Sequence, residues 1–398
     1  MDNLATVTGA PPIYLDYAAT TPIDNRVFEK MLPYMAGEID SIFGNPASST
    51  HSYGWQAKEA VSNSRALIAQ LLNVSHKEII FTSGATESNN LAISGIAKAY
   101  KKKGSHIITS ATEHKSVLDT CHNLETKGYE VSYIKPQSNG LIKLDDIKQS
   151  IRPETILMSV MHVNNETGVI QDIASIGSLA KQHNIIFHVD AAQSMGKLSL
   201  DLNKLNIDLL SISGHKIYGP KGIGALFVRR KPHKIDLVPQ MHGGGHEYGW
   251  RSGTLATHQI VGLAHALQFS LEDLSMETTK LKKFEQRLWQ ELNKLGGIYL
   301  NGEADSNHRK PGHINISVEG IHGDALIASL KNIAVSSGSA CNSAVSDTSY
   351  VLKAMGVAEP LAKSALRISM GRYTTEKNVE ATISHLMTVV NKLRAVAC

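Results

Sequence analysis

The chain has 398 residues, of which 42% are hydrophobic and 19% charged, and its formal net charge is +4 with neutral histidines. This composition is typical of a globular protein, and the charge is too small for the length to indicate a nucleic-acid-binding protein. The length predicts two domains; no run of about 18 apolar residues predicts a transmembrane helix, and residues 1–10 do not resemble a secretory signal. Three cysteines are too few for a disulfide framework, which favours a reducing, cytoplasmic setting.

Strands and helices are predicted in alternation from residue 78 onwards. The apolar run EIIFTSG (78–84) predicts a buried strand, and residues 86–103 predict a helix that ends at Gly104, with three lysines in its last turn, where cations suit the helix dipole. The next predicted elements are a strand at 106–111, a helix at 114–128, a strand at 155–163, a helix at 173–184 and strands at 185–190, 209–213 and 222–230. This alternation indicates an α/β fold with a mostly parallel sheet and helices on both faces.

The pattern changes after His265. Residues 271–296 are charged and amphipathic and predict one long helix. Three further strands are then predicted, at 313–320, 333–340 and 365–371. We therefore expect a large domain at 18–265 and a smaller α/β domain formed by 1–17 and 266–398.

Polar residues follow five of the predicted strands. They are Gly84 to Thr86, then Glu113 and His114, then Asn164 to Glu166, then Asp190 and Gln193, and finally His215 and Lys216. Ligands of open parallel sheets bind beyond the carboxyl ends of the strands. We therefore expect these side chains to meet at one site.

Each of these groups also has a simpler interpretation. TSGATESNN (82–90) either caps a helix or cradles a phosphate, but it is not a Walker A loop. Asp190 either caps the following helix or faces a protonated pyridine nitrogen. Lys216 is either a surface lysine or an amine that forms a Schiff base with an aldehyde, which would explain a lysine at the end of a core strand.

The remaining candidate functional residues lie in two glycine-rich segments and among the three cysteines. Segment 240–255 contains two histidines, but a metal site would need a third ligand, so we interpret it as an active-site loop with Thr254 as a phosphate donor. Cys341 lies in a small, polar stretch and is either a nucleophile or a tolerated surface cysteine. Cys121 has core spacing between Val117 and Leu124, and we interpret Cys398 as incidental.

The chain resembles the cysteine desulfurases of the IscS/NifS type, within the class V, fold-type I pyridoxal phosphate enzymes, over about residues 13–394. The resemblance rests on the motifs IYLDYAATTP, FGNPASSTH, FTSGATESNNLAI, TEHKSVLDTC, MHVNNETGVIQDI, HVDAAQS, SGHKIYGPKGIGAL, GGGHEYGWRSGT, SSGSACNSA and RISMGRYTT. It implies a large domain with a mostly parallel seven-stranded sheet flanked by helices. It also implies a smaller C-terminal α/β domain that carries a catalytic cysteine loop at about 336–350.

The resemblance implies a role for each matching position. The cofactor pyridoxal 5′-phosphate would contact the Schiff-base lysine Lys216, Asp190 at the ring nitrogen, Gln193 at the ring hydroxyl, His114 on the ring face, and Ala85, Thr86, Ser213 and His215 at the phosphate. Thr254 would reach the phosphate from the other subunit of a homodimer. Asn165 would lie near the ring hydroxyl and the substrate, Arg367 would anchor the substrate carboxylate, and Cys341 would accept sulfur.

The implied activity converts L-cysteine to L-alanine and transfers sulfur to Cys341 as a persulfide. The sulfur acceptor is then an iron–sulfur scaffold, a tRNA-thiolation protein or a DNA-phosphorothioation system. The sequence ends at KLRAVAC, without the C-terminal extension with which close relatives hold the scaffold, and this difference leaves the choice of acceptor open. No intrinsic metal site is expected, although Cys341 could transiently ligate an iron–sulfur cluster on a scaffold.

Other functions would use the same positions. A selenocysteine lyase or a class V aminotransferase would share Lys216 and Asp190, and a non-catalytic sulfur carrier would keep the fold without binding the cofactor. We expect no direct nucleic-acid or membrane partner.

Overall fold

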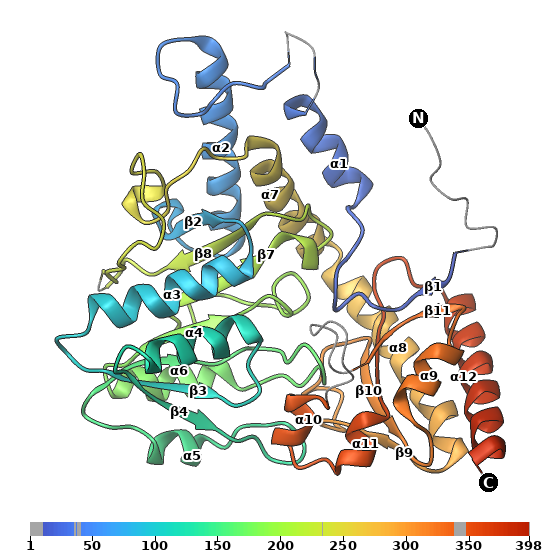
Figure 1. Cartoon of the computed structure of the whole chain (residues 1–398). Coiled ribbons are helices and arrows are strands. Elements are labelled where there is room, and N and C mark those ends of the chain that lie inside the picture. Colours follow the sequence, from blue (N-terminus) through green and yellow to red (C-terminus); the bar gives the residue numbers. More distant parts are fainter. Residues whose placement is uncertain (1–10, 36, 38–40, 233, 338–347, 398) are drawn as a thin grey trace.

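Short runs of buried apolar residues form a seven-stranded sheet in the computed structural model (Figure 1). Its strands are, in spatial order, β2 (Ile79–Thr82), β8 (Gly224–Val228), β7 (Leu209–Ser213), β6 (Ile186–Asp190), β5 (Thr155–Ser159), β3 (His106–Ser110) and β4 (Glu130–Ile134). The strands from β7 to β4 pair in parallel, and β8 is antiparallel to both of its neighbours. The predicted mostly parallel seven-stranded sheet is confirmed.

Helices cover both faces of this sheet, because successive residues of a strand point to opposite faces. One face packs under α3 (Ala85–Ala99) and α4 (Lys115–Glu125), and the other under α2 (Ser52–Leu71), α6 (Ile173–Gln182) and α7 (Thr257–Glu272). In β2, Ile80 belongs to the apolar cluster under α3 and α4, whereas Ile79 and Phe81 belong to the cluster under α2, α6 and α7. Cys121 is fully buried on the α4 side, as its spacing predicts, and burial raises the pKa of its thiol to about 12.

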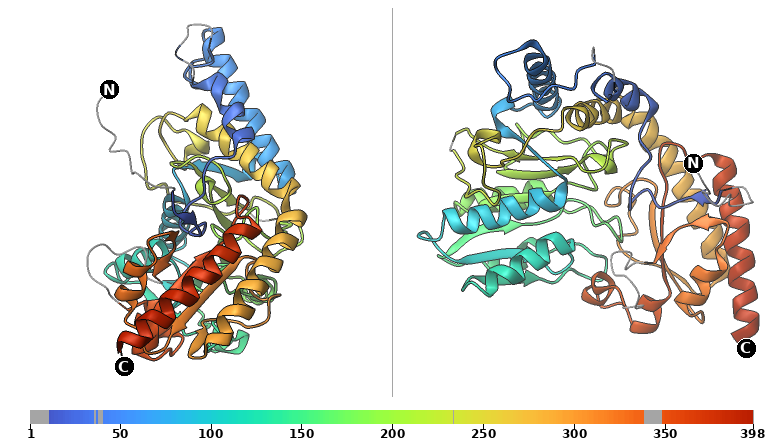
Figure 2. Two further views of the ribbon diagram at one scale, coloured as in Figure 1. Left: turned by 90° about the vertical axis from the view of Figure 1, so that its right-hand side faces the viewer. Right: turned by 45° about the horizontal axis from the view of Figure 1, so that its top comes forward.

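A second, smaller unit is built on a four-stranded antiparallel sheet. Its strands are, in spatial order, β12 (Ser336–Ser337), β13 (Ala365–Ser369), β10 (His313–Val318) and β9 (Ile298–Leu300). The helices α8 (Leu274–Leu292), α9 (Gly323–Ser329) and α12 (Glu376–Ala397) share a separate apolar cluster with these strands. Figure 2 shows α8 and α12 side by side across this unit.

The N-terminal segment belongs to the same unit. Strand β1 (Ile13–Tyr14) pairs in parallel with β11 (Ile333–Ala334), and Asp16 forms a bridge with Ser369 of β13. The chain then continues from this unit towards the large sheet (Figure 1). Residues 15–20 therefore connect the two sheets.

The structure describes residues 11–35, 37, 41–232, 234–337 and 348–397. The short helices in these ranges are α1 (Asn25–Met31), α5 (Leu144–Gln149), α10 (Tyr350–Ala354) and α11 (Glu359–Lys363). Within the described part of the chain, every helix is too short or too polar to span a bilayer.

Several predicted boundaries are wrong. Helix α3 ends at Ala99 rather than at residue 103, because the N–H groups of Lys103 and Gly104 turn back to the Tyr100 carbonyl. The three lysines thus lie in the turn after the helix. The predicted strand at 155–163 stops at Ser159.

The predicted long helix at 271–296 exists as α8, but it begins at Leu274 and ends at Leu292. Helix α7 runs to Glu272 and α8 begins at Leu274, so the break lies at Asp273. The Asp273 carboxylate accepts a hydrogen bond from Arg26 at 2.6 Å and therefore ties this junction to α1.

Candidate active site

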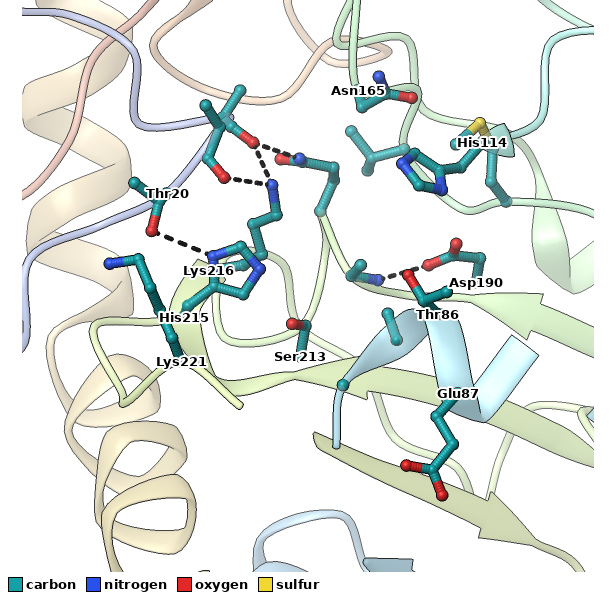
Figure 3. A pocket seen from close by; sticks show the side chains of 18 of the residues that line it. Thr20, Thr86, Glu87, His114, Asn165, Asp190, Ser213, His215, Lys216 and Lys221 are labelled. Atoms are coloured by element: carbon teal, nitrogen blue, oxygen red, sulfur yellow. Dashed lines mark hydrogen bonds between the residues drawn. The ribbon is translucent and has the colours of Figure 1, made fainter. Parts of the chain in front are cut away.

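A cavity of about 560 Å³ lies beyond the carboxyl ends of β6 and β7 and is closed on one side by the smaller unit (Figure 3). Ten sequence-predicted residues line it: Ala85, Thr86, His114, Asn165, Asp190, Gln193, Ser213, His215, Lys216 and Arg367. Thr254 is exposed and does not line this cavity, and Cys341 lies outside the described residues. Most of the predicted site residues thus meet at the ends of the strands within one chain.

Lys216 ends a short turn that directly follows β7. Its Nζ donates to the carbonyl oxygens of Ala18 at 2.6 Å and Ala19 at 2.7 Å. These acceptors come from the segment that connects the two sheets, so a primary amine is held at the cavity wall by the backbone of this connection. In Figure 3 the side chains of Lys216 and His114 approach the cavity from opposite sides.

His215 is held neutral beside this lysine. Burial lowers the pKa of its imidazole to about 4, and the charges of Lys216, Lys221 and Lys197 act in the same direction. Its Nδ1 lies 3.1 Å from Thr20 Oγ1. At neutral pH His215 therefore offers the cavity a polar ring without a charge.

The Asp190 carboxylate is fixed at the end of β6. It is 4% exposed, its Oδ2 accepts from Asn89 Nδ2 at 2.8 Å, and its Oδ1 accepts from the Ala192 N–H at 2.9 Å. Asn89 was not predicted from the sequence as a site residue. It lies three positions after Thr86 on α3, and this helical spacing is the signal that could have placed both on one face.

His114 belongs to the same hydrogen-bond network. Asn89 Nδ2 donates to Ser116 Oγ at 2.9 Å, and Ser116 Oγ lies 2.8 Å from His114 Nδ1. The Ser116 backbone N–H also donates to this Nδ1 at 3.1 Å. Since an N–H can only donate, Nδ1 is an acceptor, and the neutral ring carries its proton on Nε2.

The predicted carboxylates Glu113 and Glu166 are buried and do not line the cavity. Burial raises the pKa of Glu113 well above its usual range, and its Oε1 accepts from the Met161 N–H at 2.8 Å. Burial raises the pKa of Glu166 to about 7, although the hydrogen bond from Ser349 and the charge of Arg367 oppose this shift. Both groups support the walls rather than face a ligand.

The N-terminus of α3 forms one end of the cavity. Residues 83–87 all line it, together with Ser213 of β7. Strand β8 can approach this turn because residue 224 is glycine: a Cβ there would lie 2.7 Å from Gly84 Cα. The free N–H groups of a helix N-terminus favour an anion, so this end is suited to a phosphate.

Arg367 approaches the cavity from β13. Its side chain is 4% exposed; Nη2 pairs with Asp16 Oδ1 at 2.8 Å, and Nη1 donates to the Asn165 carbonyl at 2.9 Å. Within the described residues, Arg367 Nε and Asn165 Oδ1 are buried and lack a hydrogen-bond partner. A donor and an acceptor are thus unused at the wall, as expected of a site that binds a polar ligand.

Comparisons with known proteins agree on one family. The family model described as aminotransferase class V matches residues 13–382. A curated cysteine desulfurase IscS from Shewanella sp. (strain ANA-3) is 55% identical over 96% of this chain and 94% of its own. A curated cysteine desulfurase IscS from Pectobacterium carotovorum subsp. carotovorum (strain PC1) is 54% identical with the same coverage.

Solved structures are also similar over most of the chain. One titled NifS-like protein superposes with a TM-score of 0.88 at 35% identity and covers 96% of this chain and 100% of its own. One titled SspA in complex with cysteine has a TM-score of 0.79 at 40% identity and covers 91% of this chain and 100% of its own. On these matches, the chain belongs to the class V aminotransferase family and is a cysteine desulfurase within it.

Proposed function

We propose that pyridoxal 5′-phosphate is the cofactor and that it binds in the cavity described above. The observation that carries the proposal is that the Lys216 amine, the Asp190 carboxylate and the N-terminus of α3 line one cavity. An amine suits the aldehyde, a buried carboxylate suits the protonated ring nitrogen, and a helix N-terminus suits the phosphate. The family membership supports the same cofactor.

The remaining contacts follow the predicted roles. Ala85, Thr86, Ser213 and His215 would hold the phosphate, Gln193 the ring hydroxyl, and His114 the ring face. The unused Asn165 Oδ1 and Arg367 Nε support a polar substrate next to the ring. Bound pyridoxal phosphate supplies an aldehyde that captures the substrate amine and a ring that withdraws electrons from its α-carbon.

The chain's own residues then carry out the proton and sulfur transfers. Arg367 binds the carboxylate of L-cysteine, and Lys216 Nζ takes the α-proton and returns a proton at the end. The Cys341 thiolate attacks the substrate sulfur, and the Cβ–S bond breaks. L-cysteine and a thiol thus become L-alanine and a persulfide, with no external oxidant or reductant.

L-cysteine is the proposed substrate, and the similar structure titled as a complex with cysteine supports this choice. The Cys341 persulfide then passes its sulfur to an acceptor protein. An iron–sulfur scaffold is favoured among acceptors, because the curated relatives at 55% identity are named IscS. A thiolation or phosphorothioation protein is the other acceptor class.

We further propose a homodimer in which Thr254 reaches the partner's cavity. Large apolar side chains are exposed at one end of the large sheet: Phe28, Leu32, Met35, Phe43, Tyr53, Trp55 and Tyr248. A hollow beside α2 is lined by Asn45 to Ala47 and by His246 to Tyr248 and Leu255, so the apolar patch adjoins the loop that carries Thr254. Covering this patch would bury it and bring Thr254 to a second subunit.

We also propose the two domains predicted from the sequence, with the large domain at 18–265 and the small one at 1–17 and 266–398. The small unit has an apolar cluster separate from the two that cover the faces of the large sheet, which supports this division. A reducing compartment, the cytoplasm, is proposed from the low cysteine count.

The test is to give purified protein L-cysteine with and without dithiothreitol, and to measure alanine and sulfide. Wild type is expected to form both in equal amounts, and Cys341→Ser is expected to form neither. A variant as active as wild type would contradict the persulfide role. Pyruvate formed from alanine would indicate an aminotransferase, turnover of L-selenocysteine alone a lyase, and a colourless protein a non-catalytic carrier.

A further inference from the structure

A buried lysine lies directly behind Gln193. Lys310 is 4% exposed and precedes β10, and its Nζ donates to Gln193 Oε1 at 2.9 Å. Lys310 does not line the active-site cavity, whereas Gln193 does. Sequence reasoning did not single out Lys310, because nothing in its local pattern connects it to Gln193.

This contact determines which way the Gln193 amide faces. A carboxamide has an acceptor oxygen and a donor nitrogen of nearly the same shape, so its neighbours decide its orientation. Lys310 takes the oxygen, and Gln193 Nε2 donates to the Ala18 carbonyl at 2.8 Å. The same carbonyl accepts from Lys216 Nζ, so the NH₂ group is held beside the reactive amine.

The backbone around Lys310 is fixed on both sides. Its N–H donates to the Gly168 carbonyl at 2.8 Å. Arg309 and the Gly312 N–H both bind the buried Glu285 carboxylate, with Arg309 Nε at 2.9 Å and the N–H at 2.8 Å. A side chain on such a fixed segment can hold its partner in one position.

We propose that Lys310 is a positioning residue for the cofactor: it holds the oxygen of Gln193 so that the amide NH₂ faces the cavity as a donor to the ring oxygen. The inference rests on the proposed binding of pyridoxal phosphate and deepens it. Without Lys310, Gln193 Oε1 would lose the hydrogen bond that the amine donates, and the side chain would turn to find another donor.

The Lys310 amine is buried close to other cationic side chains. Burial lowers the pKa of its amine well below the usual range, and Lys197, Arg367 and Lys216 act in the same direction. His313 lies near it, and the small hollow that Lys310 shares with Lys197 also contains Tyr17, Tyr218 and Glu277. These neighbours disfavour the positive charge of the amine, which donates to Gln193 Oε1.

The test is a double-mutant cycle on cofactor affinity. Apo forms of wild type, Lys310→Met, Gln193→Ala and the double variant are titrated with pyridoxal phosphate, and the dissociation constants are compared. Lys310→Met is expected to weaken binding about 3- to 10-fold in the wild-type background, as the loss of one hydrogen bond does. It is expected to have less than about a 2-fold effect in the Gln193→Ala background, because coupled residues are not additive.

A second readout is the visible absorbance of the bound cofactor. Lys310→Met is expected to shift the spectrum in the same direction as Gln193→Ala, because both remove the same donor from the ring oxygen. Equal losses of affinity in both backgrounds, or no loss in either, would overturn the proposal. Lys204→Met, at a side chain that is 82% exposed, is the control and should bind like wild type.

The outcomes also separate this inference from the proposed function. Wild-type apo protein that binds no pyridoxal phosphate would contradict the proposed cofactor itself. The melting temperature of each apo variant is measured in parallel, and Lys310→Met is expected to melt no lower than wild type because it removes a buried amine. If it melts lower, Lys310→Leu repeats the cycle with a smaller side chain, under the same two criteria.

Discussion

Single residues at the site act through partners that are themselves buried. Asp190 receives a hydrogen bond from Asn89, which also donates to Ser116, and Ser116 contacts His114. The carboxylate and the imidazole are therefore positioned by the same amide. A change at Asn89 should affect both without touching either directly.

Asn89→Ala is expected to lower kcat/KM for L-cysteine about 10- to 100-fold, the range for removing a hydrogen bond to a charged group. The Asp190 carboxylate loses a donor at 2.8 Å that holds it in place beside the ring. Alanine formation at several cysteine concentrations measures the effect. Asn123→Ala, on the exposed face of α4, is the control, and an equal loss there would contradict the network.

His188 makes the fold sensitive to acid. Its ring is fully buried between two serines, with Nδ1 2.8 Å from Ser159 Oγ and Nε2 3.0 Å from Ser211 Oγ. Burial lowers its pKa to about 4, although the charge of Asp190 opposes this. Because the unfolded histidine titrates near 6.5, protonation favours unfolding, and the stability that His188 contributes above pH 6.5 is lost as the pH falls towards 4.

His188→Asn is therefore expected to be less stable than wild type by about 1–3 kcal/mol at pH 7.5, since both serines lose a partner. The difference should shrink by about 2 kcal/mol at pH 5, because only wild type carries the depressed histidine. Urea unfolding at a series of pH values measures both. A difference that does not change with pH would show that His188 is not the acid-sensitive group.

The site residues differ in how far the sequence could predict them. Lys216, Asp190 and His114 follow strands directly, so the end of the strand alone places them. Asn89 shares a helix face with Thr86, so its spacing could have placed it near the site, but its contact with Asp190 joins segments far apart in the chain. The contact of Lys310 with Gln193 is also distant in sequence, and no local pattern encodes it. Thr254 could not be placed within one chain.

Among the elements, the turn at residues 247–249 is held by a buried ion pair. Arg65 of α2 binds both Glu247 carboxylate oxygens, at 2.7 and 2.6 Å, and the Phe81 N–H of β2 donates to the same carboxylate at 2.7 Å. Glu247 and Tyr248 both have positive φ, at 50° and 58°, which disfavours non-glycine residues. The ion pair thus holds a strained turn against α2 and β2.

Glu247→Gln is expected to lower the free energy of unfolding by about 3–5 kcal/mol, because it leaves the guanidinium of Arg65 buried without a counter-charge. Urea unfolding measures the loss. Glu380→Gln removes an exposed partner of Arg287, with side chains 46% and 48% exposed, and should cost less than about 1 kcal/mol. Similar losses in the two variants would mean that burial does not matter here.

Elements with strong patterns were predictable, and those with weak patterns were not. The strands β5, β6 and β7 are buried along their whole length, and their short, mostly apolar runs made them predictable. Strand β4 lies at the edge of the sheet and is mostly half-exposed, so its sequence has no continuous apolar run and was not predicted. The junction at Asp273 binds Arg26, which is distant in sequence, so no local pattern marks this contact.

At the scale of the whole molecule, the apolar patch on and around α1 and α2 exposes large apolar side chains that a partner subunit would bury. Trp55 is 55% exposed and Phe43 is 56% exposed, although Trp55 Nε1 donates to the Ser49 carbonyl within the chain. Trp55→Glu is expected to convert the proposed dimer to a monomer, because a carboxylate would be buried at the interface. Light scattering during gel filtration measures the mass.

The same variant should also bind pyridoxal phosphate more weakly, since Thr254 of the partner would be lost. Met276→Glu is the matched control: the side chain is 68% exposed on α8 and is not one of the residues of the patch, so the mass and affinity of this variant should equal those of wild type. A Trp55→Glu protein that stays dimeric would place the interface elsewhere.

The N-terminal segment that connects the two sheets has a consequence for biosynthesis. Ala18 and Ala19 hold the Lys216 amine, Asp16 pairs with Arg367, and β1 needs β11 as its neighbour. Strand β1 therefore waits for β11, more than 300 residues later in the chain, before its hydrogen bonds can form. A chain arrested before residue 367 would have Lys216 but not the guanidinium that pairs with Asp16, so the wall that Arg367 forms is added only late in synthesis.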